Sequence, residues 1–248
     1  MSFHKQRRGV VEAGLSDRAF PMEAIVLAGG FGTRLASVVQ GVPKVLAPVG
    51  NRPFLELLLR RLKQRGMQRV ILSVGYLASM IRERFGEQFE GGELAYAIED
   101  EPLGTGGATR KALTMAQHDT VFVMNGDTFV DLDYAAMLSQ HIDLEGIASI
   151  AVANTDDCTR YGRMITREGR VVGFTEKGQS GPGQISVGTY LMNRDLFAPY
   201  NMPAAFSLEQ DFFVPHIKQL RPLAFATSGY FIDIGIPEDL ARAQSELK

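Results

Sequence analysis

Apolar strand patterns and amphipathic helix patterns alternate along this chain from Met22 onward. A strand followed by a helix and then by another strand builds a parallel sheet with helices on both faces. We therefore expect an α/β fold, a three-layer sandwich around a mostly parallel central sheet. The predicted strands are 23–28, 69–74, 93–100, 120–127 and 147–153, and the predicted helices between them are 53–66, 78–85, 106–117 and 133–142.

The pattern changes after about residue 160. The segment "GRMITREGRVVGF" (162–174) predicts a β-hairpin that turns at Glu168-Gly169, and 185–192 predicts another strand. We interpret this stretch as a small β-rich insertion. Residues 237–248 predict a closing helix with Pro237 in its first turn. Residues 1–21 lack such patterns, so we expect a disordered extension followed by one domain over 22–248.

Composition argues against several classes of protein. The formal net charge is −2 at pH 7, so nucleic acid is not expected as the main partner. The single cysteine, Cys158, cannot build a disulfide framework or a multi-cysteine metal site, and it indicates a reducing compartment such as the cytoplasm. No run reaches the roughly 18 apolar residues that a transmembrane helix needs, so no membrane partner is expected.

The glycine-rich loop "AGGFGTR" directly follows the first predicted strand. Gly29, Gly30 and Gly32 can take positive φ and let backbone N–H groups approach an anion closely. Arg34 and Lys44 add cations that suit phosphate oxygens. The spacing matches neither the P-loop nor the G-x-G-x-x-G pattern of dinucleotide binding. The loop therefore predicts a phosphate site of another kind, with an ordinary strand-to-helix turn as the alternative.

A second glycine-rich loop, "EPLGTGGA", follows the third predicted strand. Its exposed backbone amides and carbonyls could read a flat heterocycle. A plain helix N-terminal turn with Thr105 as the cap would have the same sequence.

Two aspartates follow apolar runs. Asp127 ends the strand "TVFVMNGD", and Asp233 follows the apolar part of "YFIDIG". Mg²⁺ favours one or two carboxylates together with phosphate oxygens and water, so this pair predicts a metal–nucleotide site. The alternative for Asp127 is a turn or helix-cap residue. Because ligands bind at the carboxyl ends of strands in open parallel sheets, the three loops should meet at one edge.

The motifs together resemble one enzyme family. "LAGGFGTRL…PK", "NRPFLELLL", "EDEPLGTGGA", "NGDTF", "FTEK", "VGTYLMN" and "DIGIPEDL" occur in order from about Met22 to the C-terminus. They resemble the sugar-1-phosphate nucleotidyltransferases, also called nucleoside-diphosphate-sugar pyrophosphorylases. The segments "SVGYLASMI" and "SLEQDFF" are most similar to guanylyltransferases for D-glycero-D-manno-heptose 1-phosphate. One departure is Ala36-Ser37 after Leu35, where the family usually has R-L-x-P.

The resemblance implies a Rossmann-like three-layer sandwich and transfer of a nucleoside monophosphate from GTP to a sugar 1-phosphate, with Mg²⁺ as cofactor. It also assigns roles by position in the motifs. Arg34 and Lys44 are assigned to catalysis, and Asp127 and Asp233 to metal binding. The residues assigned to nucleotide binding are Leu27, Ala28, Gly29, Gly30, Gly32, Thr33, Glu101, Gly104 and Thr105. The residues assigned to sugar-phosphate binding are Gly162, Glu176, Lys177, Gly188 and Thr189.

Other functions stay open at this point. A uridylyltransferase, or an enzyme for N-acetylmuramate, mannose or glucose 1-phosphate, would share these motifs. A non-catalytic regulatory subunit would lack one of the four catalytic or metal residues, and all four are present. A cytidylyltransferase for a phosphate such as phosphocholine would want an aromatic cage, for which Tyr161 and Tyr190 are candidates. The sequence also leaves open whether the protein forms a homodimer.

Overall fold

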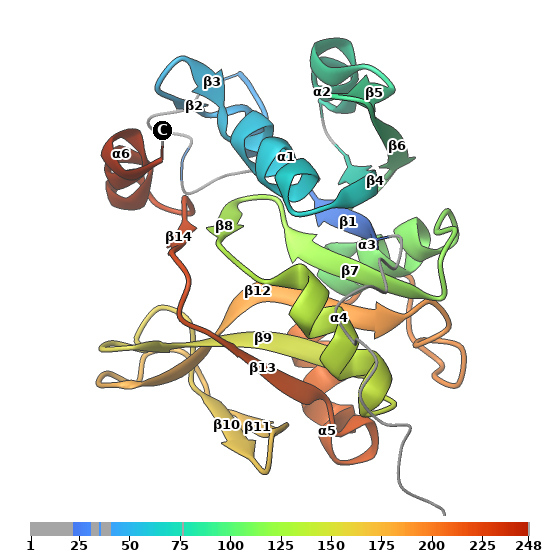
Figure 1. Ribbon diagram of the computed structural model, residues 1–248, viewed down its shortest axis with the longest axis vertical. Helices are drawn as coiled ribbons and strands as arrows, with labels where there is room; N and C mark the ends of the chain where they lie inside the picture. The colour runs from blue at the N-terminus through green and yellow to red at the C-terminus, as the bar shows by residue number, and fades with distance from the viewer. Residues whose placement is uncertain (1–21, 31–34, 36–40, 76, 248) are drawn as a thin grey trace, which may run out of the picture.

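The computed structural model describes residues 22–30, 35, 41–75 and 77–247, and it has the predicted α/β architecture (Figure 1). The strands are β1 Met22–Leu27, β2 Pro48–Val49, β3 Arg52–Pro53, β4 Met67–Val74, β5 Gln88–Phe89, β6 Gly92–Ile98, β7 Thr120–Asn125, β8 Thr128–Val130, β9 Ala148–Thr155, β10 Met164–Arg167, β11 Arg170–Phe174, β12 Gly183–Asn193, β13 Leu223–Thr227 and β14 Phe231–Asp233. The helices are α1 Phe54–Gln64, α2 Ala78–Phe85, α3 Gly104–Leu113, α4 Tyr134–Asp143, α5 Val214–Leu220 and α6 Pro237–Glu246, with a short 3₁₀ turn η2 Lys44–Leu46 and a π-helical turn η3 Leu208–Phe213.

Ten of the described strands form one sheet, in the order β10-β11-β13-β9-β12-β7-β1-β4-β6-β5. Strands β7, β1, β4 and β6 are parallel neighbours, and β9 and β13 are also parallel to each other. Strand β12 lies between β7 and β9 and is antiparallel to both, so β7 and β9 point the same way. The centre of the sheet is therefore mostly parallel, as predicted.

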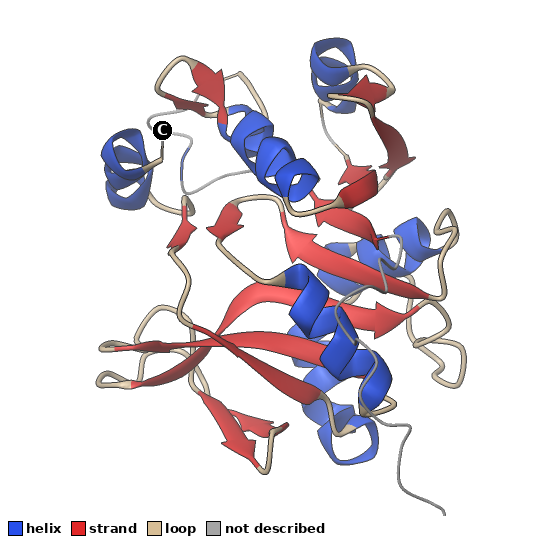
Figure 2. Ribbon diagram, viewed as in Figure 1, coloured by secondary structure: helices blue, strands red, loops and turns tan. Residues whose placement is uncertain are grey.

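The residues of β1 show why helices are needed on both faces of the sheet. Ala24 and Val26 belong to a buried cluster with side chains of α1, α2 and α4, whereas Ile25 belongs to another with α3, η3 and α5. Because side chains alternate across a strand, a continuously apolar strand must be covered on both sides. The helices flank the strands accordingly (Figure 2).

The expectation of a separate β-rich insertion after residue 160 is wrong for most of that stretch. Strand β12 completes the middle of the main sheet, and β10 and β11 form the hairpin at its end. Its turn is as predicted, because Glu168 and Gly169 have φ values of 50° and 70°, both left-handed as in a two-residue hairpin turn. The place of β12 depends on pairing with β7 and β9, which no local pattern specifies.

Residues 208–227 form elements that the sequence patterns above did not predict, namely η3, α5 and β13. The Ser207 hydroxyl accepts from Gln210 N at 3.2 Å, and the Asp211 carboxylate accepts from Ser207 N at 2.7 Å. This reciprocal arrangement resembles a capping box and marks where the helical segment begins. Pro215 interrupts the pattern but lies in the first turn of α5, a place that proline tolerates.

His141, near the end of α4, is buried and contacts two polar side chains. Its Nδ1 is 2.7 Å from Ser149 Oγ, and its Nε2 is 3.2 Å from Asn193 Oδ1. The Asn193 oxygen can only accept, so Nε2 carries the ring proton and Nδ1 accepts from the Ser149 hydroxyl. Burial lowers the pKa of His141, and the Asn193 hydrogen bond acts in the opposite direction.

We expect this histidine to make stability depend on pH. Below the ordinary histidine pKa the unfolded chain binds a proton that the folded ring does not, so stability is lost as the pH falls toward the lower folded pKa. His141→Gln removes the titrating group. Urea unfolding between about pH 7.5 and pH 5.5 should therefore show a smaller loss of stability in the variant than in the parent. Parallel curves for the two proteins would contradict this assignment.

Candidate active site

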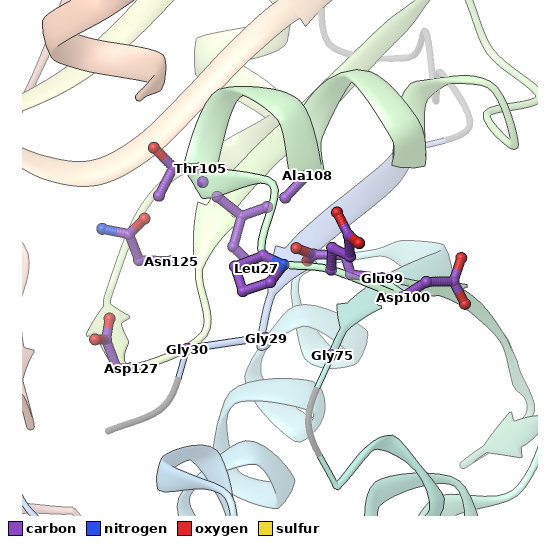
Figure 3. Close-up of a pocket in the computed structure, with 13 residues that line it drawn as sticks. Leu27, Gly29, Gly30, Gly75, Glu99, Asp100, Thr105, Ala108, Asn125 and Asp127 are labelled. Atoms are coloured by element: carbon purple, nitrogen blue, oxygen red, sulfur yellow. The ribbon is translucent and has the colours of Figure 1, made fainter. Parts of the chain in front are cut away.

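A cavity of about 700 Å³ opens where the parallel strands β1, β4, β6 and β7 end. The structure brings the three predicted loops together there, in agreement with the rule for open parallel sheets. Figure 3 shows Asn125 and Asp127 at one end of this cavity and Glu99 and Asp100 at the other. The lining residues are Leu27, Gly29, Gly30, Gly75, Glu99, Asp100, Glu101, Pro102, Gly104, Thr105, Ala108, Asn125 and Asp127.

The first glycine loop reaches the cavity, but not through the backbone conformation expected. Gly29 and Gly30 do not have positive φ. A Cβ atom on Gly29 would lie 2.8 Å from Glu99 Oε1 and 3.2 Å from Gly75 N, so glycine is needed there for close packing. A Cβ atom on Gly30 would meet no atom of the described residues within 4 Å.

Other predicted residues of this loop divide into two groups. Leu27 lines the cavity, and Ala28 is buried behind it with its N–H donating to Ser73 O at 2.7 Å. Gly32, Thr33 and Arg34 lie outside the described residues.

The second glycine loop is the first turn of α3, because the helix begins at Gly104, two residues earlier than predicted. Thr105 is not the cap; its Oγ1 accepts from Leu208 N at 2.9 Å. Added Cβ atoms on Gly106 and Gly107 would collide with the Phe206 ring and Ala204 O, at 2.1 and 2.4 Å. All three glycines of this turn are therefore required by packing, since a Cβ atom on Gly104, which has a φ of +66°, would lie 2.6 Å from Phe206 O. Gly104, Thr105 and Glu101 line the cavity.

The two predicted metal ligands lie close together. Asp233 ends β14, which pairs with β8 so that Asp233 is opposite Thr128, and Ile234 N donates to Asp127 O at 2.9 Å. Buried side chains of α6, including Leu240 and Ala243, pack against Ile232 and Ile234 and hold this strand in place. The pairing of two short strands thus brings together aspartates that are far apart in the sequence.

Lys44 forms an ion pair with the first of these carboxylates. Its Nζ is 2.5 Å from Asp127 Oδ2, and its side chain is only 12% exposed. Burial and the nearby charge of Asp127 raise the pKa of Asp233, while the charges of Lys44 and Arg160 and a backbone N–H from Gly235 act in the opposite direction. Two acids and a lysine whose charges act on one another in a partly desolvated place are typical of a site built for a charged ligand.

The donor set of this pair fits Mg²⁺. Among the described residues there is no group of three or more His, Cys, Asp or Glu side chains that could hold a metal by itself. Mg²⁺ in phosphate-transfer sites is held by one or two carboxylates, with the remaining positions left to phosphate and water. Asp127 and Asp233 are therefore the residues that would hold it.

The five predicted sugar-side residues do not line this cavity, but Gly188 adjoins it through the lining residue Asn125. Gly188, with φ +67°, packs against Asn125; its added Cβ would be 2.5 Å from Asn125 Nδ2. Thr189 is buried beside it, in register with Met124 of β7. Gly162 is buried, and an added Cβ would lie 2.7 Å from Thr175 O.

Glu176 and Lys177 are exposed and follow β11. Their loop is tied to the loop before β10, because Gly178 N donates to Thr159 O at 2.9 Å and Arg163 N donates to Thr175 Oγ1 at 2.9 Å. The two loops that carry the predicted residues Gly162, Glu176 and Lys177 thus form one unit.

Arg160 links that unit to Asp233, one of the two predicted metal ligands, and sequence reasoning missed it. Its Nη2 is 3.8 Å from Asp233 Oδ2, it forms an ion pair with Asp239, and its guanidinium lies 5.2 Å from the centre of the Tyr161 ring. Arg160 lies two residues before Gly162, which the sequence analysis assigned to the site. An arginine in that short segment was therefore the sequence signal that could have identified it. Glu99 was missed in the same way beside Glu101.

A family model described as nucleotidyl transferase matches residues 23–248. The chain belongs to the nucleotidyl transferase family. It is 42% identical to D-glycero-alpha-D-manno-heptose 1-phosphate guanylyltransferase of Aneurinibacillus thermoaerophilus over 92% of this chain and 99% of that protein. It is 39% identical to the enzyme of the same name from Campylobacter jejuni, over 88% of this chain and 96% of that one.

Solved structures agree with this membership of the nucleotidyl transferase family. The crystal structure of HddC from Yersinia pseudotuberculosis superposes with a TM-score of 0.82 at 36% identity, covering 92% of this chain and all of that one. A second HddC structure, complexed with GMP-PN, superposes with a TM-score of 0.81. Within the described residues, no helix is both long enough and apolar enough to span a bilayer.

Proposed function

We propose that this protein transfers GMP from GTP to D-glycero-α-D-manno-heptose 1-phosphate, releasing pyrophosphate and the GDP-sugar. The observation that carries the proposal is the meeting of Lys44, Asp127 and Asp233 at one end of a cavity whose other end has room for a base. Two relatives with this activity in their names match nearly their whole length, and HddC has been crystallised with GMP-PN. A cytoplasmic location is in keeping with Cys158, which is buried and free.

The reaction requires that the two substrates be positioned and that their negative charge be compensated. A phosphate oxygen of the sugar 1-phosphate attacks the α-phosphorus of GTP, and the bond from that phosphorus to the bridging oxygen of the leaving pyrophosphate breaks in line. No general base is required, because the attacking phosphate is already anionic at neutral pH. Catalysis then depends on aligning the two substrates and stabilising the charge that develops in the transition state.

Each part of the site has a role in this scheme. The backbone of Gly29 and Gly30 approaches the triphosphate, Arg34 binds the departing pyrophosphate, and Lys44 stabilises charge on the α-phosphate. Mg²⁺ held by Asp127 and Asp233 would act as a Lewis acid on nucleotide oxygens. The direct contact between Lys44 and Asp127 supports these two roles.

The described geometry also speaks against a cationic headgroup as the acceptor. Tyr190, one of the two cage candidates, is buried and stacks on Phe213, and its hydroxyl donates to Glu209 at 2.5 Å. Such a ring cannot surround a quaternary ammonium group without unpacking the core.

The proposed reaction is tested by mass spectrometry of the product formed from GTP, heptose 1-phosphate and Mg²⁺, which should be GDP-heptose. Pyrophosphate released at the same rate without the sugar would contradict it.

Lys177→Met separates the sugar side from the nucleotide side. The substitution keeps the apolar stem and deletes a charge that would offset repulsion between the two anionic substrates. We expect KM for the sugar 1-phosphate to rise at least about tenfold, roughly 1.4 kcal/mol, with little change in GTP affinity. Lys218→Met, which removes another exposed lysine from α5, is the control and should change neither quantity. Loss of GTP affinity with an unchanged sugar-phosphate KM would instead place Lys177 on the triphosphate side.

A further inference from the structure

Arg160 is held at a fixed place beside one of the predicted metal ligands. Its guanidinium forms an ion pair with Asp239, whose side chain is only 7% exposed, and its central carbon lies 5.2 Å from the centre of the Tyr161 ring. The Tyr161 ring in turn packs edge-on against Phe231 of β14, with 5.6 Å between the ring centres. The Nη2 atom is 3.8 Å from Asp233 Oδ2, and the side chain remains 36% exposed. The arginine is therefore oriented in advance and still open to solvent.

The buried carboxylate of Asp239 does not depend on Arg160 alone. Arg242, three residues further along α6, places its Nη1 3.0 Å from Asp239 Oδ1. Asp239 also lies in the first turn of α6, where the helix dipole favours a negative charge. Neutralising Asp239 therefore does not by itself account for Arg160.

Metal binding at Asp233 would change what Arg160 faces. The charges that act on the Asp233 carboxylate come from Asp127, Lys44 and Arg160, so that two carboxylates are balanced by two cations. Mg²⁺ held by the two aspartates would compensate their charge, and the positive charge of Arg160 would then attract a further anion. A phosphate monoester, which carries about −1.5 to −2 charges at pH 7, is such an anion.

The loop of Arg160 belongs to the predicted sugar side. Gly162 lies two residues further on, and Thr159 O accepts from the N–H of Gly178, the residue after Lys177, at 2.9 Å. Arg160 thus joins the loops assigned to the sugar 1-phosphate to the residues assigned to the metal. The attacking phosphate has to lie between these two parts, because it is attached to the sugar and its oxygen must reach the α-phosphorus of the nucleotide.

We propose that Arg160 binds the phosphate group of the sugar 1-phosphate, an inference that rests on the reaction proposed above. Its Nη1 stays on Asp239, and its Nη2 exchanges the long contact with Asp233 for a phosphate oxygen. Arginine suits this role because its guanidinium is always charged and its planar fork fits phosphate oxygens. A side chain that Asp239 and Tyr161 already orient loses little conformational entropy when the phosphate binds.

The experiment compares Arg160→Met with Arg242→Met, which removes the same charge from the other oxygen of the same carboxylate. In Arg160→Met, KM for the sugar 1-phosphate should rise about tenfold to a hundredfold, the range for a hydrogen bond to a charged group. KM for GTP should change less than about threefold, and Arg242→Met should keep both KM values within about threefold of the parent. Arg160→Lys keeps a charge beside Asp239 and so protects the fold. It should still raise the sugar-phosphate KM by about threefold to tenfold, because an ammonium group lacks the planar fork.

A binding measurement gives a readout that needs no turnover. Calorimetry follows heptose 1-phosphate binding to enzyme that holds Mg²⁺ and a GTP analogue that cannot react. The dissociation constant should rise about tenfold or more in Arg160→Met and stay at the parent value in Arg242→Met.

Three results would overturn the role of Arg160. One is a parental sugar-phosphate KM in Arg160→Met, or in Arg160→Lys where only that variant folds. Another is an equal rise in Arg242→Met, which would mean that the charge balance at Asp239 sets the KM. The third is a loss of GTP affinity with an unchanged sugar-phosphate KM. A parent that releases no pyrophosphate, or that uses a different sugar 1-phosphate, would instead overturn the proposed function, so the two failures are distinguishable.

Discussion

Asp127→Asn should lower kcat by about a thousandfold at ordinary Mg²⁺ concentrations. The substitution keeps the shape of the side chain and removes one of two carboxylates that would hold the metal, and the metal is expected to stabilise the transition state by several kcal/mol. Activity should partly recover at high Mg²⁺ or with Mn²⁺, because weakened binding can be offset by concentration or by a metal of higher affinity. The measurement is a metal titration of initial rate.

The matched control is Asp119→Asn, which removes a carboxylate that is 94% exposed and lies beside Arg194. Its titration curve should follow that of the parent. If the curve of Asp127→Asn also superimposes on that of the parent, Asp127 is a turn residue and the metal site lies elsewhere.

Lys44→Ala should reduce turnover by on the order of a hundredfold or more while leaving GTP binding largely intact. The expected loss is that of a charge-stabilising group aimed at the transition state. Lys111→Ala is the control, since this lysine lies on α3 near exposed Asp100 rather than beside Asp127. Turnover within a few fold of the parent would contradict a catalytic role for Lys44.

The contact between Lys44 and Asp127 adds a sharper expectation. Their charged atoms are 2.5 Å apart, and groups in contact show non-additive effects when both are changed. The double variant should therefore lose much less activity than the product of the two single losses. Full additivity would mean that the two residues act independently, against the geometry described here.

The fold was predictable wherever local periodicity decides the structure. Helix α2 has the predicted bounds of 78 and 85, and the Glu168-Gly169 turn is where the sequence placed it. Strand β12 was predicted as a strand but not in its place, because its position depends on pairing with β7 and β9 across long stretches of sequence. The helical segment after Ser207 has a capping signature, but π-helical geometry and Pro215 obscure its period.

The candidate site was predictable in its loops and less so in its details. Asp127 and Asp233 could be paired in advance because Mg²⁺ chemistry needs such a pair, and the β8–β14 pairing brings them together. The glycines of the α3 turn were harder to interpret, because the chain that fills the space beside them comes from residues 204–206. Arg160 and Glu99 were not predicted because a partner of each, Asp239 and Ser73 respectively, comes from a distant segment.

The most direct test of the central claim is a matrix of initial rates for pyrophosphate release. Each of GTP, ATP, UTP and CTP is combined with heptose, N-acetylmuramate, mannose and glucose 1-phosphates in the presence of Mg²⁺. We expect the highest kcat/KM for GTP with D-glycero-α-D-manno-heptose 1-phosphate, and no release when either substrate is omitted. A maximum with UTP, or with a sugar other than the heptose, would contradict the proposed substrates, and no release in any combination would contradict the proposed reaction itself.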